Sequence, residues 1–370
     1  MCIICRGESL ENLEDLEVCE NVSEIPELPQ SLTHLYCFYC PLLTTLPELP
    51  QSLRVFYFYI CPLLITIPEL PLSLTEFYCH ACLLLTTLPK LPQSLTILDC
   101  SRCPLLTTLP KLPQSLTDLE CRDCPLLTTL PKLPQSLEHL DCSNCPLLAT
   151  LPELPQSLRV FYFYICPLLI TIPELPLSLT EFYCHACLLL TTLPKLPQSL
   201  TILDCSRCPL LTTLPKLPQS LTDLECRDCP LLTTLSELPQ SLKTLYCNNC
   251  PLLTTLPKLP QSLKYLDCSN CPLLATIPEL PQSLTYLNCY NCTGLIFVYE
   301  SALKFIPLKL LNSINNYLKW RQQQSYDWFS SKTGIIYEEL IRKTWHPSRA
   351  IDWCWDTEEV KWFKSLPITN

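Results

Sequence analysis

The sequence contains very little glycine. Only 3 of its 370 residues are Gly, against 38 Pro and 28 Cys. Loops that hold a phosphate group need several closely spaced glycines, because the backbone must approach the ligand with no side chain in the way. We therefore expect no nucleotide-binding loop of that kind.

Long apolar runs are also missing, although 48% of the residues are hydrophobic. No stretch reaches the roughly 18 apolar residues of a membrane-spanning helix, so no membrane association is expected. The opening segment MCIICRGESLENLEDLEVCE has no apolar run of signal-peptide length. We expect a cytoplasmic protein whose cysteines stay reduced. Acylation of Cys2 or Cys5 is an alternative, and an unmodified terminus is preferred.

Basic residues are too few to attract a polyanion. The formal net charge is −10, and residues 25–300 hold twenty-one Asp or Glu against fourteen Lys or Arg. An acidic surface repels phosphate groups. Nucleic acid is therefore not an expected partner.

A 21-residue repeat occupies most of the chain. Its first unit is IPELPQSLTHLYCFYCPLLTT at Ile25–Thr45, and twelve units of the same length follow it. A fixed period of this size predicts a solenoid, in which each coil buries its apolar side against its neighbours.

The order of residues within the unit indicates the type of solenoid. The unit follows L-x-x-L-x-C-x-x-C-x-x-L, beginning at Leu32. Leu35 and Cys37 are two residues apart, so they share the inward face of a short strand, and Tyr36 points outward. The prolines of LPELP exclude an ordinary helix after the strand. The pattern resembles the leucine-rich repeat, which implies a solenoid with short parallel strands on the concave face, here with an extended or polyproline-II convex side.

Three regions are expected. Residues 1–24 form a degenerate N-terminal capping repeat, in which Leu13, Leu16, Val18 and Asn21 reproduce the pattern. Residues 25–298 form the array of thirteen repeats. Residues 299–370 contain all six Trp and form a mainly helical C-terminal cap.

A longer duplication lies inside the array. Residues 45–130 are identical to residues 150–235, at outward as well as inward positions. Every candidate residue in this block occurs twice, which argues against a unique catalytic group there.

The cysteines support two interpretations. Eleven of the thirteen units contain Cys-x-x-Cys, and this spacing is typical of structural zinc sites. Both cysteines nevertheless fall in inward slots, and Phe58 and Phe163 replace the first one in two units. We therefore favour buried, inert thiols that act as small apolar side chains, with no cofactor and no metal. In the second slot, where leucine-rich repeats usually have Asn, the thiol replaces the amide as a weaker hydrogen-bonding group. Metal binding and disulfides remain alternatives.

The outward strand positions are the candidate binding residues. One position per unit forms a row that we predict to face water and bind a protein partner, because Tyr offers a large contact area at little entropic cost. The alternative is that these residues are simply favoured on any exposed strand. The row is Tyr36, Tyr57, Tyr78, Asp99, Glu120, Asp141, Tyr162, Tyr183, Asp204, Glu225 and Tyr246, followed by Asp267 and Asn288.

Catalysis finds little support. Asp118 and Glu120 lie on a regular exposed strand, whereas general acid–base chemistry needs burial and a partner that tunes the pKa. His80 follows Cys79 directly, and adjacent strand residues point to opposite faces, so the two cannot act as a pair. We expect no enzymatic activity.

Two further resemblances concern the origin of the chain. The repeat phrase LPELPQSL and the tail motif WHPSRAIDWCWDTEE (345–359) resemble leucine-rich-repeat proteins of giant amoeba-infecting DNA viruses. This resemblance implies a repeat protein that acts in the host cytoplasm and has no known catalytic residues. The repeat phrase is also similar to bacterial effector ubiquitin ligases, whose Cys-x-Asp motif matches Cys354-Trp355-Asp356, although the tail is much shorter than that ligase domain.

The main functional hypothesis is therefore a non-enzymatic protein–protein interaction module. The alternatives are a metal-stabilised structural array and a ligase-like effector that uses Cys354.

Overall fold

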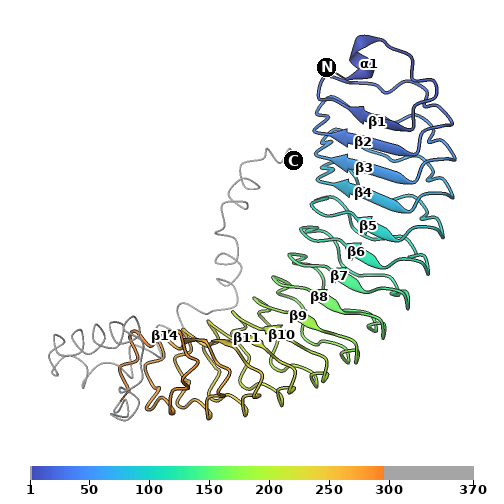
Figure 1. Cartoon of the computed structure of the whole chain (residues 1–370). Helices are drawn as coiled ribbons and strands as arrows, with labels where there is room; N and C mark the ends of the chain where they lie inside the picture. Colours follow the sequence, from blue (N-terminus) through green and yellow to red (C-terminus); the bar gives the residue numbers. More distant parts are fainter. Residues whose placement is uncertain (1, 296–370) are drawn as a thin grey trace. The chain divides into compact units, whose positions relative to one another are not determined.

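The computed structural model describes residues 2–295, which belong to two compact units. The first unit is Met1–Tyr183 with Pro194–Leu200, and the second is Cys184–Leu193 with the chain from Thr201 onward. In each unit, successive coils stack on one another (Figure 1). The last three residues of the predicted array, the predicted C-terminal cap at 299–370 and Cys354 lie outside the described residues.

The first unit contains the short helix α1 (Ile3–Arg6) and nine strands that pair in parallel in chain order. The strands are β1 (Asp15–Val18), β2 (His34–Phe38), β3 (Val55–Tyr59), β4 (Glu76–His80), β5 (Ile97–Asp99), β6 (Asp118–Glu120), β7 (His139–Asp141), β8 (Val160–Tyr162) and β9 (Glu181–Tyr183). The predicted capping repeat at residues 1–24 therefore contains α1 and β1.

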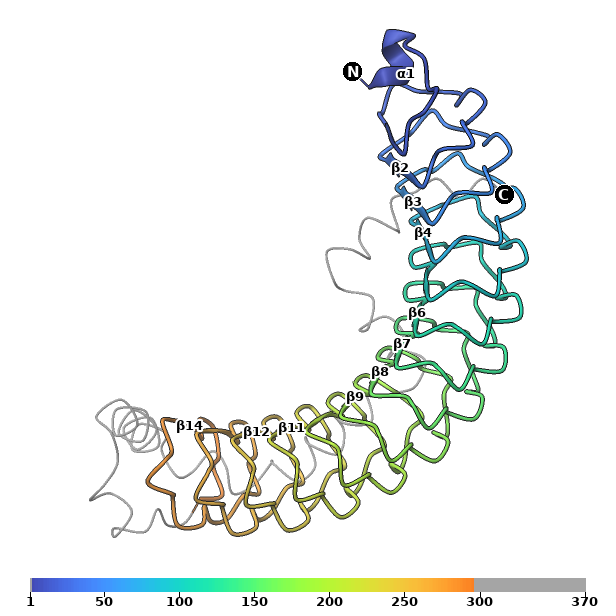
Figure 2. The ribbon, with the colours of Figure 1, turned by 45° about the vertical axis from the view of Figure 1, so that its right-hand side comes forward.

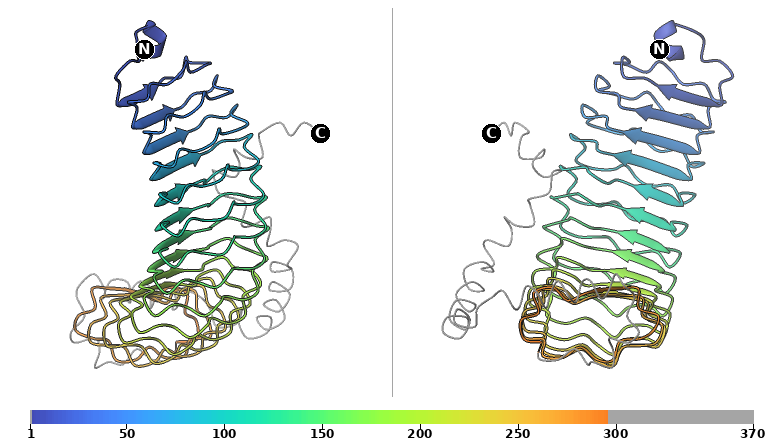
Figure 3. Two further views of the ribbon diagram at one scale, coloured as in Figure 1. Left: turned by 90° about the vertical axis from the view of Figure 1, so that its right-hand side faces the viewer. Right: turned by 60° about the vertical axis from the view of Figure 1, so that its left-hand side comes forward.

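The second unit continues the same pattern with five parallel strands. They are β10 (Ile202–Asp204), β11 (Asp223–Glu225), β12 (Thr244–Tyr246), β13 (Tyr265–Asp267) and β14 (Tyr286–Asn288). Within each unit the strands lie side by side on one face, and irregular segments return along the other (Figure 3). The predicted parallel solenoid is confirmed.

The core of each coil consists of the predicted inward residues. In the first repeat, Leu32, Leu35, Cys37, Cys40 and Leu43 are all 0% exposed. The alternation along β2 places the side chain of Tyr36 on the opposite, half-exposed face. Burying apolar side chains stabilises each coil by about 25 cal/mol for every Å² removed from water.

The return segment is shaped by two turns. The Leu43 N–H donates to the Cys40 carbonyl at 3.3 Å, and Pro41 occupies the second turn position, where its fixed φ is favoured. The Leu53 N–H then donates to the Pro50 carbonyl at 3.1 Å. The segment between these turns is neither helix nor strand, as the prolines predict, and the repeating outline of the coils is visible in Figure 2.

Side chains also tie each coil to the preceding one. The Ser52 hydroxyl donates to the Leu32 carbonyl at 2.6 Å, and the same bond recurs at other coils. The Cys103 thiol donates to the carbonyl of Cys79 at 3.1 Å. The second cysteine therefore forms the backbone hydrogen bond expected of that slot, whereas the role of the serine in PQSL was not anticipated.

Each of the thirteen repeats also contains one residue in the left-handed region, directly before the cysteine in the second slot. Ile60 has φ 57° and Asn144 has φ 53°, although this region favours glycine. Where Asn occupies the slot, the amides can bond along the stack, as from Asn270 Nδ2 to Asn249 Oδ1 at 2.7 Å. The coil thus makes this bend without glycine.

Candidate functional site

The outward row forms a continuous line within each unit. In the first unit, Tyr36 pairs with Tyr57 and Tyr57 with Tyr78. The register then continues to Asp99, Glu120, Asp141, Tyr162 and Tyr183. In the second unit, the line contains Asp204, Glu225, Tyr246, Asp267 and Asn288.

The first three strands of the row present a group of rings that we call the aromatic patch: His34, Tyr36, Phe38, Tyr57 and Tyr78. Phe38 and Tyr57 have ring centroids 5.0 Å apart, and Tyr57 and Tyr78 are 4.9 Å apart. Phe38 remains 40% exposed. Aromatic rings at these separations attract one another. The other four rings are half-buried, so the patch is a partly exposed aromatic surface.

The phenol of Tyr78 is held in place. Its hydroxyl donates to Glu76 Oε2 at 3.1 Å. Burial raises the pKa of Tyr78, and the charge of the Glu76 carboxylate raises it further. The phenol is therefore neutral and oriented before any partner arrives, which reduces the entropic cost of binding.

A smaller aromatic group lies on β7 to β9. Tyr162 and Tyr183 stack at 4.4 Å, and His139 lies 5.7 Å from Tyr162. The Tyr183 hydroxyl donates to Glu181 at 3.2 Å, which repeats the arrangement of Tyr78. The duplicated tyrosines are thus paired in both copies, but next to different neighbours.

Between the two aromatic groups lies the acidic segment, Asp99, Glu120 and Asp141. Burial tends to raise the pKa of Asp99, but hydrogen bonds from His80 and Ser101 outweigh it, so the pKa is lowered. Burial and the negative charge of Asp99 raise the pKa of Glu120. Arg122 lies 3.9 Å from the Glu120 carboxylate and partly offsets this charge.

The prediction that the whole row faces water is wrong for two residues. Asp141 is only 5% exposed and Asp204 only 8%. Each carboxylate accepts the backbone N–H of the serine two residues later, Ser143 at 2.9 Å and Ser206 at 3.0 Å. These aspartates bend the chain where the strand ends, and so serve the fold as well as the surface.

This structural role was missed in the sequence, although a signal was present. The sequence Asp-Cys-Ser occurs wherever the row residue is Asp, as at Asp99-Cys100-Ser101 and Asp267-Cys268-Ser269. In both places the serine N–H donates to the aspartate, at 2.8 Å and 2.9 Å. An Asp side chain that accepts the backbone N–H two residues later forms a known turn motif.

The second unit has its own mixture of rings and charges. The Arg227 guanidinium lies 5.8 Å from the centre of the Tyr246 ring, close enough for a cation–π contact. Tyr265 and Tyr286, beside the row, are 45% and 43% exposed, with centroids 6.5 Å apart. The strand face of the second unit therefore exposes more aromatic surface than the residues of the row alone provide.

The repeat cysteines are buried thiols. Burial is the main cause that raises the pKa of Cys100 and Cys121 well above the usual value. Within residues 2–295, no three repeat sulfurs lie within 4.8 Å of one another. The metal-stabilised array therefore has no geometric support in this part of the chain.

No helix among residues 2–295 is long and apolar enough to cross a membrane.

The comparisons with known proteins agree with the geometry. The Leucine Rich Repeat family model matches residues 94–116, 136–158, 199–221, 241–263 and 262–284. Among curated proteins, none matches the sequence.

Two of the similar solved structures are YopM proteins. The structure of YopM from Yersinia pestis, described as a leucine-rich effector protein, is 30% identical, with 78% of this chain and 90% of that chain covered and a TM-score of 0.61. YopM from Yersinia enterocolitica WA-314 is 29% identical, with 78% and 79% covered and a TM-score of 0.49. The family and the Yersinia pestis structure support a protein-interaction repeat module. The chain belongs to the leucine-rich repeat family.

Proposed function

We propose that the chain is a non-enzymatic binding protein whose partner crosses the strand face of the first unit. The observation that carries the proposal is the aromatic patch, where rings from three adjacent strands contact one another on one partly exposed surface. Aromatic anchors of this kind commonly supply most of the binding energy of a protein interface.

The acidic segment determines the charge that the second half of the partner should have. Asp99, Glu120 and Asp141 continue the row directly from Tyr78. A partner that places apolar side chains on the rings and lysine or arginine beside Asp99 and Glu120, the two partly exposed carboxylates, complements both halves. The path from Tyr36 to Glu120 crosses four strand spacings of about 4.8 Å, or roughly 19 Å, which about six extended residues would span.

The competing explanation is that Tyr merely suits an exposed strand. It does not account for the grouping, because the tyrosines cluster on β2 to β4 instead of alternating with the acids along the row. Nor does it account for Phe38, which adds an exposed ring without a polar group beside Tyr57.

A displayed library of random peptides provides the test. Peptides enriched on the wild-type protein are synthesised, and their dissociation constants are measured by fluorescence anisotropy. Replacing both Tyr57 and Tyr78 with Ala should weaken binding by about tenfold or more, since truncated aromatic anchors typically cost more than 1 kcal/mol. The enriched peptides should combine apolar and basic residues.

The matched control is Leu72→Ala. Leu72 is 78% exposed and lies outside the strands, in the segment before β4. Its replacement removes an exposed apolar side chain without touching the rings, so binding should not change. Equal losses in the two variants, or no loss in the tyrosine variant, would contradict the proposed binding face.

We further propose that the protein acts in the cytoplasm of a host cell, as the resemblance to giant-virus repeat proteins implies. The buried thiols support this location, because they suit a reducing compartment. Immunofluorescence in infected amoebae should place the protein in the cytoplasm, and a signal confined to another compartment would contradict it.

A further inference from the structure

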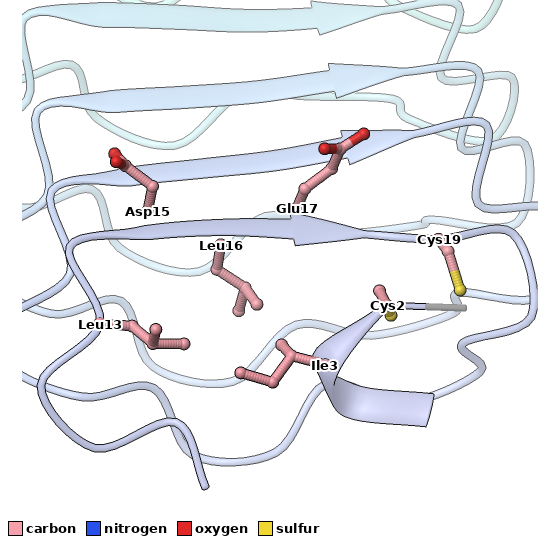
Figure 4. Close-up of a pocket in the computed structure, with 7 residues that line it drawn as sticks. All are labelled: Cys2, Ile3, Leu13, Asp15, Leu16, Glu17 and Cys19. Atoms are coloured by element: carbon pink, nitrogen blue, oxygen red, sulfur yellow. The ribbon is translucent and has the colours of Figure 1, made fainter. Parts of the chain in front are cut away.

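Three cysteines stand apart from the repeat thiols at the N-terminal end. Cys2 and Cys5 lie one helical turn apart around α1, and Cys19 directly follows β1. All three are only partly buried, whereas every described cysteine in the thirteen repeats is buried. Figure 4 shows Cys2 and Cys19 beside each other at the end of the first strand.

The sulfur atoms of these residues form a compact group. The Sγ atoms of Cys5 and Cys19 are 3.4 Å apart, and all three sulfurs lie within 4.8 Å of one another. Sulfurs bound about 2.3 Å from one tetrahedral zinc ion are roughly 3.8 Å apart. The observed 3.4 Å is close to this value and far longer than a disulfide bond of about 2.05 Å, and the other two separations stay below 4.8 Å.

We propose that Cys2, Cys5 and Cys19 form a binding site for one thiophilic cation, in the first place Zn²⁺. Three thiolates select soft or borderline ions over Mg²⁺ and Ca²⁺. Two of the three cysteines line a pocket of about 420 Å³, whose walls are Cys2, Ile3, Leu13, Asp15, Leu16, Glu17 and Cys19. This pocket leaves room for a solvent molecule as the fourth ligand of the ion.

The local packing gives such an ion a structural role. Helix α1 has four residues, none of them buried, and its first residue has no side-chain cap. Isolated helices this short are unstable in water, because too few hydrogen bonds offset the entropy of nucleation. A cation held by Cys2, Cys5 and Cys19 would fasten α1 to the end of β1 and so close the exposed end of the first unit.

The repeat thiols do not compete for this role. Their second cysteines donate to carbonyls of the preceding coil, as Cys124 does to Cys100 at 3.3 Å. Nowhere else between residues 2 and 295 do three cysteine, histidine or acidic side chains bring their ligand atoms this close.

The test is a Co²⁺ titration of the reduced, metal-free full-length protein. We expect one site per chain, with the intense near-ultraviolet absorption of thiolate-to-cobalt charge transfer, which one equivalent of Zn²⁺ abolishes. Cys19→Ser should lose this absorption. Glu17→Gln, which changes a pocket carboxylate and keeps the three thiols, and Cys354→Ser should both retain it.

Stability measurements separate metal binding from damage to the cap. Zn²⁺ should raise the urea midpoint of the wild type and of Glu17→Gln, and leave that of Cys19→Ser unchanged, whatever the stabilities of the metal-free proteins. Three results would overturn the proposal. They are no stoichiometric binding in the wild type, retained charge-transfer absorption when all three cysteines are replaced by serine, and a Cys5–Cys19 disulfide in protein kept under reductant.

Discussion

Residues 54–78 and 159–183 have the same sequence, yet their strands differ. In the first copy, β3 extends over five residues, Val55–Tyr59, whereas in the second copy β8 ends after three, at Tyr162. The coil before β3 contains Tyr36-Cys37-Phe38, which pairs along its whole length. The coil before β8 contains Asp141-Cys142-Ser143, where the Ser143 N–H turns back to Asp141. A preceding coil can therefore determine how far the next strand extends.

The surface rings differ for the same reason. Tyr57 contacts Phe38 of the preceding coil at 5.0 Å, whereas Tyr162 contacts His139 at 5.7 Å. Burial of the core shows no such difference, because Phe58 and Phe163 are both 0% exposed. The packing of their rings differs slightly, with centroids 4.1 Å apart for Phe56 and Phe58 and 4.8 Å apart for Phe161 and Phe163. Which side chains are buried thus follows from the sequence of the coil, whereas its surface also depends on its neighbour.

The largest expected effect concerns the shared interior. Phe58→Ala and Phe163→Ala should each lower the free energy of unfolding by about 3–5 kcal/mol, since each leaves a large cavity in a fully buried core. Urea unfolding of the two variants should agree within about 1 kcal/mol, and Tyr59→Ala, on the outward face, should cost less. A clear difference between Phe58 and Phe163 would show that neighbours also control the core.

The second effect concerns binding, where the copies should differ. Replacing Tyr57 and Tyr78 with Ala should weaken binding of the selected peptides about tenfold or more. Replacing Tyr162 and Tyr183 should weaken their binding less, since only the first pair belongs to the larger patch. Anisotropy with one peptide under identical conditions measures both losses.

A double substitution tests whether the preceding coil causes this difference between the copies. Combining Asp141→Tyr with Ser143→Phe gives the second copy the preceding residues of the first. We expect β8 to lengthen and the second tyrosine pair to become a binding surface, visible as an additional peptide site by calorimetry. An unchanged stoichiometry would contradict the proposed influence of the preceding coil.

The third effect is the pH dependence of stability, which should differ between aspartates of the same row. Hydrogen bonds lower the pKa of Asp99 and of its copy Asp204 despite their burial. Their ionised forms therefore add stability above the ordinary pKa of an unfolded aspartate, and this stability is lost as the pH falls through the lowered value. Asp99→Asn and Asp204→Asn should cost about 1–2 kcal/mol near neutral pH and little in acid.

Asp141 should behave in the opposite sense. Burial raises its pKa despite the hydrogen bonds from Ser143 and the charges of Arg122 and His139. The stability associated with its protonated form is lost as the pH rises through the raised value, so Asp141→Asn should be neutral or stabilising near pH 7. Urea midpoints at several pH values measure all three variants, and parallel curves for Asp141→Asn and Asp204→Asn would contradict the assignment.

Much of the fold could be predicted because one short pattern recurs. Leu35 and Cys37 showed which side of the strand is buried, and the prolines showed that no helix follows it. The row residues could be aligned for the same reason. The burial of Asp141 and the length of β8 could not be predicted, because both depend on contacts between coils that a single repeat does not encode. The N-terminal thiol group was missed because Cys19 meets Cys2 and Cys5 only after α1 has folded back toward β1.

The smallest effect concerns the left-handed residues Ile60 and Ile165, with φ 57° and 56°. A branched side chain is disfavoured in this region, whereas Asn is tolerated, so Ile60→Asn and Ile165→Asn should each stabilise the protein by about 1 kcal/mol. The copies should again differ, because only Ile165 follows an asparagine, Asn144, in the corresponding slot of the preceding coil. The new amide there can pair with Asn144 as Asn270 pairs with Asn249. Thermal unfolding should therefore show a larger gain for Ile165→Asn than for Ile60→Asn, and equal gains would mean that backbone strain alone controls this position.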